Sequence, residues 1–235
     1  MPDITTILTA HSEGVMAGLS LRSMKEAARH AEEKDLEVEI LIVLDSPNTS
    51  TRQAFEGLED SKVRIIEVDY GDQGMSRNAG VQTANGDFVA FLDGDDLWSF
   101  NWLSDAYAAV RENTVIHPEF NYFFGSSNNI MVKIDDRTSY FDPEFLRVGN
   151  FWDALCLAPR TVYLSYPYYE RDIKNGFAYE DWHWNCVTLE AGISHRVAPD
   201  TIHFKRRRPE SQSVHSGNRK AIVKPTALFK YDWYQ

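Results

Sequence analysis

The chain has 235 residues, of which 24 are Lys or Arg and 35 are Asp or Glu, so its formal net charge at pH 7 is -11. A protein this acidic repels a polyanion, which excludes nucleic acid as a partner. Cys156 and Cys186 are its two cysteines, too few for a disulfide framework or a four-cysteine zinc site. The hydrophobic fraction of 43% is enough for the core of one large domain.

Targeting signals are not recognisable in this sequence. The first residues lack the basic and long apolar regions of a secretory signal, and no stretch reaches the roughly 20 apolar residues of a membrane span. We therefore expect a soluble, cytoplasmic protein. Such a protein could also associate peripherally with the inner face of a membrane, or with a partner domain.

In the first part of the chain, apolar runs alternate with amphipathic segments. Buried strands are predicted over residues 4–8, 38–44, 63–68 and 88–92. Helices are predicted over residues 16–31, around 55–58 and over 74–84. This alternation predicts an α/β fold that is Rossmann-like, with a mostly parallel sheet and helices on both of its faces.

The pattern becomes less regular in the second part of the chain. Helices are predicted over residues 103–110 and 180–192, and strands over 121–134 and 161–165. Aromatic residues crowd this region, and we expect most of them to belong to the core. We expect one domain over residues 1–215, with a regular half over 1–112 and a smaller mixed half over 113–215, followed by a tail over 216–235.

Three carboxylates follow the fourth predicted strand, in the sequence FVAFLDGDDLW. Asp93 and Asp95 would face the same side of an extended chain, and Gly94 lets the backbone bend between them. Carboxylate oxygens suit Mg²⁺ or Mn²⁺, which share their coordination with substrate phosphates. The competing interpretation is an acidic, solvated turn, because Asp-x-Asp alone is a short pattern.

Other polar residues also follow predicted strands. His11 and Glu13 come after the first strand, Asp45 after the second and Asp93 after the fourth. In a parallel sheet the carboxyl ends of the strands meet at one edge, where ligands bind. The sequence therefore predicts a single ligand crevice at this edge.

Several short motifs occur in a characteristic order. They are His11-Ser12-Glu13, Asp45, Gly74-Met75-Ser76-Arg77-Asn78, Asp93-Gly94-Asp95-Asp96 and the segment GFAYEDW over residues 176–182. Together they resemble the family 2 glycosyltransferases, which have the GT-A fold. The resemblance implies an inverting enzyme that moves a sugar from a nucleotide-diphosphate donor to a hydroxyl of a saccharide or lipid-linked acceptor, in bacterial surface polysaccharide synthesis. Residues 1–112 would bind the nucleotide-sugar and residues 113–215 the acceptor.

The resemblance also implies roles for individual residues. Those implied to bind the nucleotide-sugar are His11, Glu13, Asp45, Arg77, Asp93, Asp96 and Arg207. The implied cofactor is Mn²⁺ or Mg²⁺, with Asp95, Asp93 and His203 as its ligands. Asp181 would be the general base that takes the proton of the acceptor hydroxyl, and Glu180 would orient the site. One base implies a single displacement with inversion at the anomeric carbon.

The chain departs from the family pattern at two places. Ser46 and Pro47 stand where many relatives have a second acidic residue, which affects recognition of the nucleotide base. Arg208 stands where many relatives have a histidine. This substitution leaves the third metal ligand open between His203, His215 and water.

Three other classes of protein share parts of this pattern. A sugar nucleotidylyltransferase would need a Gly-rich, Lys-containing loop, which is absent between Ile4 and Met16. A dinucleotide-dependent dehydrogenase would need G-x-G-x-x-G after the first strand, which is also absent. A non-catalytic nucleotide-binding module would keep Asp45 and Asp95 but would have no use for Asp181, so this residue separates it from the enzyme.

Overall fold

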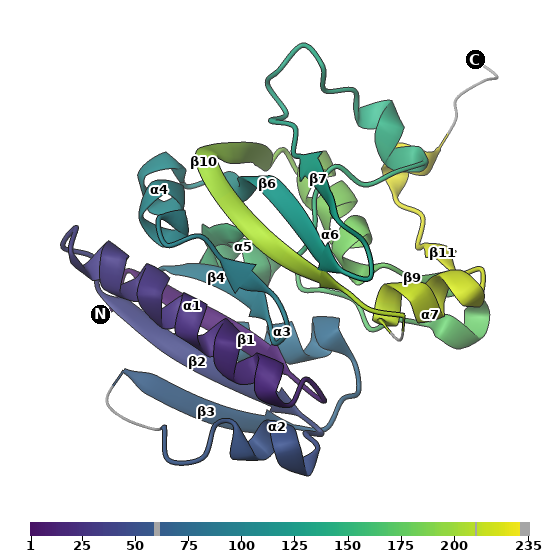
Figure 1. The fold of residues 1–235 in the computed structure, drawn as a ribbon. Coiled ribbons are helices and arrows are strands. Elements are labelled where there is room, and N and C mark those ends of the chain that lie inside the picture. The colour runs from purple at the N-terminus through teal and green to yellow at the C-terminus, as the bar shows by residue number, and fades with distance from the viewer. Residues whose placement is uncertain (59–61, 210, 231–235) are drawn as a thin grey trace.

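The computed structural model describes residues 1–58, 62–209 and 211–230, and it has a large sheet with helices on both faces (Figure 1). Nine strands of the described part form this sheet in the order β3-β2-β1-β4-β8-β6-β10-β5, with β7 beside β6. Their bounds are β1 Ile4–Ala10, β2 Val38–Asp45, β3 Val63–Val68, β4 Phe88–Asp93, β5 Leu97–Trp98, β6 Thr114–Gly125, β7 Asn129–Val132, β8 Leu157–Pro159 and β10 Ser194–Arg207. The mostly parallel α/β fold predicted from the sequence is confirmed.

The sheet contains two parallel blocks, and β5 and β7 run antiparallel to their neighbours β10 and β6. β3, β2, β1 and β4 are parallel neighbours, and so are β6 and β10. β8 lies between the blocks and runs antiparallel to both β4 and β6. One continuous sheet therefore carries both halves of the chain, so that residues of the second half reach the strand ends of the first.

Helices cover the two faces of this sheet. Their bounds are α1 Val15–Glu32, α2 Thr49–Gln53, α3 Gln73–Thr83, α4 Trp102–Ala109, α5 Arg160–Ser165, α6 Glu180–Glu190 and α7 Gln212–Asn218. Because side chains alternate along a strand, Ile4 and Leu8 join one buried cluster with α1 and α4, and Ile7 joins another with α3 and α5. Burial on both faces explains why these strands are apolar along most of their length.

Three predicted elements differ from the structure. The strand predicted over residues 121–134 is the end of β6, a turn and the antiparallel strand β7. Residues 161–165, predicted as a strand, lie in the helix α5, where Val162 and Tyr163 are buried against the core. Packing of these two side chains overrides the preference of Thr, Val and Tyr for strands. The helix expected around residues 55–58 ends at Gln53, so that Phe55 is buried from the turn that follows α2.

Most of the expected tail is folded against the domain. α7 crosses the boundary expected between residues 215 and 216, and β11 (Ile222–Val223) pairs with β9 (Phe177–Ala178). Thr226 and the backbone N–H of Leu228 both donate to Glu190 of α6. Residues 216–230 of the expected tail therefore contact the domain, the domain bounds stay a prediction, and residues 231–235 lie outside the described part. Among the described helices, none combines the length and apolar character needed to cross a membrane.

Gly86 provides a test of this arrangement, because it lies where the chain enters β4 beside β1. A Cβ atom added to Gly86 would lie 2.5 Å from the Thr5 nitrogen and 2.7 Å from the Ile4 carbonyl carbon. Since backbone atoms cannot yield as a flexible side chain can, we expect Gly86→Ala to lower the free energy of unfolding by about 1–3 kcal/mol, measured by urea denaturation. Gly18→Ala in α1, where nothing lies within 4 Å, is the control and should raise stability by up to about 1 kcal/mol. Equal midpoints for Gly86→Ala and the wild type would contradict this packing.

Candidate active site

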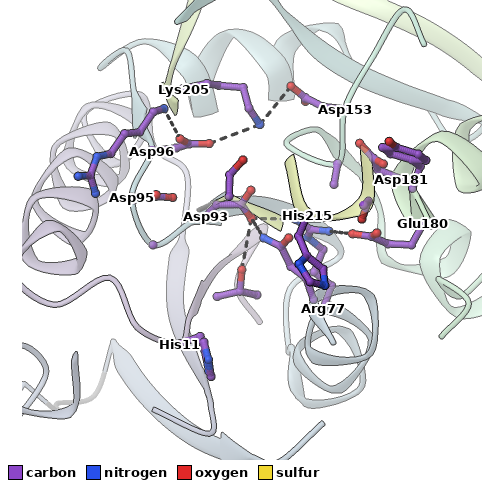
Figure 2. Close-up of a pocket in the computed structure, with 18 of the residues that line it drawn as sticks. His11, Arg77, Asp93, Asp95, Asp96, Asp153, Glu180, Asp181, Lys205 and His215 are labelled. Carbon is purple, nitrogen blue, oxygen red and sulfur yellow. Dashed lines mark hydrogen bonds and ion pairs between the residues drawn. The ribbon is translucent and has the colours of Figure 1, made fainter. Parts of the chain in front are cut away.

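A large cavity lies at the carboxyl ends of β1, β2 and β4, where the second half of the chain meets the first (Figure 2). Its volume is about 1060 Å³. The predicted site residues that line it are His11, Glu13, Asp45, Arg77, Asp93, Asp95, Asp96, Glu180, Asp181 and Arg207. The structure thus brings residues from distant motifs to one cavity.

Asp45 ends β2 and holds the loop that leads into α3. Its Oδ1 accepts hydrogen bonds from the N–H groups of Tyr70 and Gly71 at 2.8 and 2.9 Å. Its Oδ2 accepts from the N–H of Asp72 at 3.1 Å and from the hydroxyl of Ser76 at 2.7 Å. Burial opposes ionisation, but these hydrogen bonds outweigh it and lower the pKa of Asp45. Asp45 is therefore an ionised anchor for this wall of the cavity.

Arg77 of α3 is a buried cation that joins the two halves of the chain. Its Nη2 lies 2.8 Å from Asp93 Oδ1, and its Nη1 lies 3.1 Å from Glu180 Oε1. The rings of Phe91 and Tyr168 lie beside the guanidinium, at 5.9 and 5.7 Å. Burial opposes the charge of Arg77, but the two carboxylates outweigh it and raise the pKa. Arg77 thereby fixes the end of β4 against the start of α6.

The acidic motif forms a turn rather than a continued strand. β4 ends at Asp93, and the N–H of Asp96 donates to the Asp93 carbonyl at 3.1 Å. The expected strand alternation is therefore not what places Asp95 in the cavity. A Cβ atom at Gly94 would lie 3.0 Å from the carbonyl oxygen of Thr9, so glycine lets this turn approach the end of β1 closely.

Basic residues at the end of β10 neutralise this acidic turn. Arg208 Nε lies 3.2 Å from Asp95 Oδ2, and its Nη2 lies 3.5 Å from Glu13 Oε1. Lys205 Nζ lies 3.4 Å from Asp96 Oδ2. Arg208 thus carries positive charge between two carboxylates of the cavity.

The chemistry of the acidic turn fits a hard divalent cation. Burial, followed by the charges of Asp93 and Glu13, raises the pKa of Asp95 against the opposing charge of Arg208. A cation would relieve this repulsion, and carboxylate oxygens are the ligands it prefers. Within the described residues, no three His, Cys, Asp or Glu side chains form a ready ligand group. A cation at this turn would therefore need further ligands beyond these carboxylates.

His203 does not belong to this cavity, and its prediction as a metal ligand is contradicted. The ring is fully buried, stacks on Trp98 with centroids 6.0 Å apart, and meets the edge of Trp102 at 4.8 Å. His203 is not among the residues that line the cavity. Burial lowers the pKa of His203 well below its usual value, as expected for an imidazole in the core. His11 and His215 are the histidines that do line the cavity among the described residues.

Asp181 lies in the first turn of α6 and faces the cavity. Tyr179, the residue immediately before α6, is in the left-handed region with φ 63° and ψ 59°. This conformation is unfavourable for a residue with a Cβ. Burial, and then the charge of Glu180, raise the pKa of Asp181 to about 7, although Arg77 opposes them. A carboxylate with such a pKa can accept a proton near neutral pH, as a general base must.

A group of residues on the wall opposite His11 belongs to none of the motifs in the sequence (Figure 2). Asp153, Asn121 and Lys205 line the cavity together with Trp152. Lys205 belongs to the arginine-rich run near the end of β10, and this concentration of positive charge is a sequence feature that could have indicated it as a site residue. Asp153 and Asn121 belong to no motif, and only the fold brings them to the cavity.

Residues 5–164, more than half of the chain, match the family described as Glycosyl transferase family 2. The chain therefore belongs to this family, in agreement with the order of its motifs.

Two curated relatives are similar over part of their length. UDP-Glc:alpha-D-GlcNAc-diphosphoundecaprenol beta-1,3-glucosyltransferase WfgD of Escherichia coli is 31% identical over 96 residues, which cover 40% of this chain and 38% of WfgD. Poly(ribitol-phosphate) beta-N-acetylglucosaminyltransferase TarS of Staphylococcus aureus is 34% identical over 80 residues, which cover 33% of this chain and 14% of TarS. The chain thus spans well under half the length of either relative.

Two solved structures share the fold. S. aureus TarS 1-349 in complex with UDP-GlcNAc has a TM-score of 0.64 at 17% identity, over 91% of this chain and 61% of that one. The mannosyltransferase PcManGT from Pyrobaculum calidifontis, in complex with GDP-Man and Mn²⁺, has a TM-score of 0.63 at 17% identity, over 93% and 61%. These likenesses identify the fold as that of GT-A glycosyltransferases.

Arg77→Met tests the role of the buried cation in the fold. The substitution leaves Asp93 and Glu180 close together without their positive partner, so we expect the free energy of unfolding to fall by about 3–5 kcal/mol in urea denaturation. Arg52→Met is the matched control, because the Arg52–Glu67 pair is about half exposed and should contribute less than about 1 kcal/mol. A similar decrease in the free energy of unfolding for the two variants would show that Arg77 does not stabilise the junction between β4 and α6.

Proposed function

We propose that the protein is an inverting glycosyltransferase that moves a sugar from a nucleotide-diphosphate donor to a hydroxyl of a saccharide or lipid-linked acceptor. The observation that carries this proposal is a single cavity that holds both Asp181, a carboxylate with a raised pKa, and the acidic turn with its basic neighbours. The proposed binding surface for the nucleotide-sugar comprises His11, Glu13, Asp45, Arg77, Asp93, Asp96 and Arg207. Membership of the glycosyltransferase family supports this assignment.

The proposed reaction is a single displacement. Asp181 accepts the proton of the acceptor hydroxyl while the hydroxyl oxygen forms a bond to the anomeric carbon. The bond from that carbon to the diphosphate oxygen breaks, and the electron pair stays on the diphosphate. Arg207 and Arg208 line the cavity and would offset this negative charge. Glu180 would orient the site through its ion pair with Arg77, and attack opposite the leaving group inverts the anomeric carbon.

We also propose that Mn²⁺ or Mg²⁺ binds at Asp95 and Asp93. When bound, such a cation stabilises the charge of the leaving diphosphate as a Lewis acid. Two observations support the proposal. The turn offers carboxylate oxygens that repel one another, and the fold is similar to that of a mannosyltransferase solved with GDP-Man and Mn²⁺.

The proposed acceptor class and cellular role rest on the relatives. The name of WfgD specifies transfer to a diphosphoundecaprenol-linked GlcNAc, and that of TarS specifies poly(ribitol-phosphate). We propose that this chain likewise acts in bacterial surface polysaccharide synthesis, from the cytoplasmic side of the membrane. Peripheral contact with the membrane would bring a lipid-linked acceptor to the cavity.

Asp181→Asn tests the proposed base. The amide cannot accept the proton, so we expect the release of nucleoside diphosphate during transfer to fall by about 100-fold or more, while Mn²⁺-dependent binding of the donor persists. In the wild type, kcat should fall as the pH drops below about 7, because protonation of Asp181 removes the base. Unchanged turnover in Asp181→Asn would eliminate this residue as the base, and donor binding without any transfer by the wild type would favour a non-catalytic nucleotide-binding module.

Thermal unfolding with UDP, GDP, dTDP and CMP, each with and without Mn²⁺, tests the donor site and the cation together. A ligand that binds only the folded state stabilises it by about 2.7 kcal/mol at one hundred times its dissociation constant. We expect one nucleotide to raise the melting temperature, more so with Mn²⁺, and Asp95→Asn to remove the increment due to Mn²⁺. Absence of a shift with all four nucleotides would contradict the donor-site assignment.

A further inference from the structure

β7 is an edge strand of the sheet. It pairs with β6 along one edge, and no helix or strand of the described residues packs along the other. The N–H of Lys133, the residue after β7, donates to the carbonyl of Glu119 in β6 at 2.8 Å. Because successive residues of a strand direct their N–H and carbonyl groups to alternate sides, those of Ile130 and Val132 point away from β6. The outer edge of β7 therefore offers backbone donors and acceptors to another strand.

The side chains at this edge are apolar and exposed. Ile130 is 61% exposed and Val132 is 58% exposed. They lie directly opposite Tyr122 and Phe120 of β6, so the four side chains share one face of the sheet. Met131 points to the other face and lines the cavity. The face that carries Ile130 is therefore the one turned away from the proposed active site.

This apolar face continues onto β10. Phe204 lies beside Tyr122 in the neighbouring strand, and their rings meet in a T-shaped arrangement with centroids 6.0 Å apart. Nearer the start of the two strands, Ile116 and Ala198 lie on the same face and are buried in the cluster that contains α1 and α4. In Figure 1, α4 lies over the start of β6 and β10, and no described helix lies in front of β7. An uncovered apolar face thus adjoins the unpaired edge.

The edge also lacks the residues that usually prevent pairing with another chain. Edge strands of natural proteins commonly carry lysine, proline or a bulge for this purpose. β7 and the turn before it, residues 126–132, contain no Lys, Arg, Asp, Glu or Pro. Lys133 follows directly, but its ammonium group is buried 2.8 Å from Asp153 Oδ1. By contrast β3, at one end of the sheet, contains Arg64 and Glu67.

The chemistry of this edge fits a polypeptide strand and not a lipid surface. Backbone N–H and carbonyl groups that enter hydrocarbon without partners are strongly destabilising, because the bilayer core holds no water to bond them. A second strand supplies both kinds of group at the spacing of the edge, and its apolar side chains cover those beside it. The absence of charge over residues 126–132 requires a strand that is itself uncharged.

We propose that β7 pairs antiparallel with β7 of a second copy of this chain, across a two-fold axis at Met131. Ile130 then lies opposite Val132 of the second copy, and each such pair exchanges two N–H···O bonds. Two copies with a formal net charge of -11 each repel one another over most of their surface, so an uncharged strand is where they can approach. A two-fold pair also occupies both edges and leaves neither open. This inference is independent of the proposed function.

Sedimentation velocity tests the pairing. For the wild type, we expect the mass of two chains to appear as the concentration rises from about 1 to about 100 µM. Ile130→Lys places an ammonium group opposite Val132 of the second copy at two symmetric positions, so the dissociation constant should rise about tenfold or more. Ile222→Lys is the matched control, because Ile222 of β11 is 59% exposed and belongs to a separate two-stranded sheet. Its dissociation constant should equal that of the wild type.

A cross-linking variant makes the test independent of any effect of Ile130→Lys on folding. Met131→Cys would place one thiol on each side of the two-fold axis, at a position without direct hydrogen bonds, where facing Cα atoms lie about 4.5 Å apart and a disulfide can form. Cys156 and Cys186 are buried and do not compete for mild oxidant. We expect a disulfide-linked pair of chains from Met131→Cys and none from Ile222→Cys. Thermal unfolding of each variant is measured alongside.

The outcomes divide clearly. Self-association that Ile130→Lys weakens and Ile222→Lys does not, together with cross-linking of Met131→Cys, would support the proposal. A wild type that stays a single chain at every concentration would overturn it and leave the edge to a strand of another protein. Self-association that persists in Ile130→Lys, without cross-linking of Met131→Cys, would also overturn it, because the contact would then lie elsewhere.

Discussion

The candidate site depends on one buried guanidinium. Arg77 lies between Asp93, at the end of β4, and Glu180, at the start of α6, and so connects two motifs that are 87 residues apart in sequence, from 93 to 180. Two carboxylates brought this close repel each other unless a cation lies between them, and at low dielectric that cation must be well placed. Arg77 thus satisfies both partners. Burial and the charge of the neighbouring Glu180 raise the pKa of Asp181, the proposed base, and Arg77 opposes them.

The charge of the cavity is balanced locally, although the protein carries a net charge of -11. Arg208 faces Asp95 and Glu13, and Lys205 lies between Asp96 and Asp153. These cations lie at the end of β10. This strand pairs with β6, which belongs to the same sheet as β1 to β4. An acidic protein thereby gains positive groups where a diphosphate would develop charge, without becoming attractive to polyanions overall.

The elements that could be predicted from the sequence are those with a repeating pattern or a local motif. The strands β1 to β4 were predictable because burial on both faces makes them continuously apolar, and Asp93, Asp95 and Asp181 because short motifs fix their neighbours. The sequence was insufficient where distant packing decides. Residues 161–165 favour a strand but become α5 through contacts with the core, and His203 looks like a metal ligand but is enclosed by Trp98 and Trp102. No local signal could reveal Asp153, because its supporting residues come from strands that meet only in the folded protein.

The protonation of Asp181 is the most direct test of the account. Carbon-13 NMR of the carboxyl groups, recorded against pH for the wild type and for Asp181→Asn, would assign the resonance of Asp181 by its loss in the variant. We expect this resonance to titrate with a pKa of about 7, because burial and the charge of Glu180 outweigh the opposing charge of Arg77. A pKa near the ordinary aspartate value of about 4 would contradict the account, because it would show a solvated carboxylate rather than a base enclosed by the cavity.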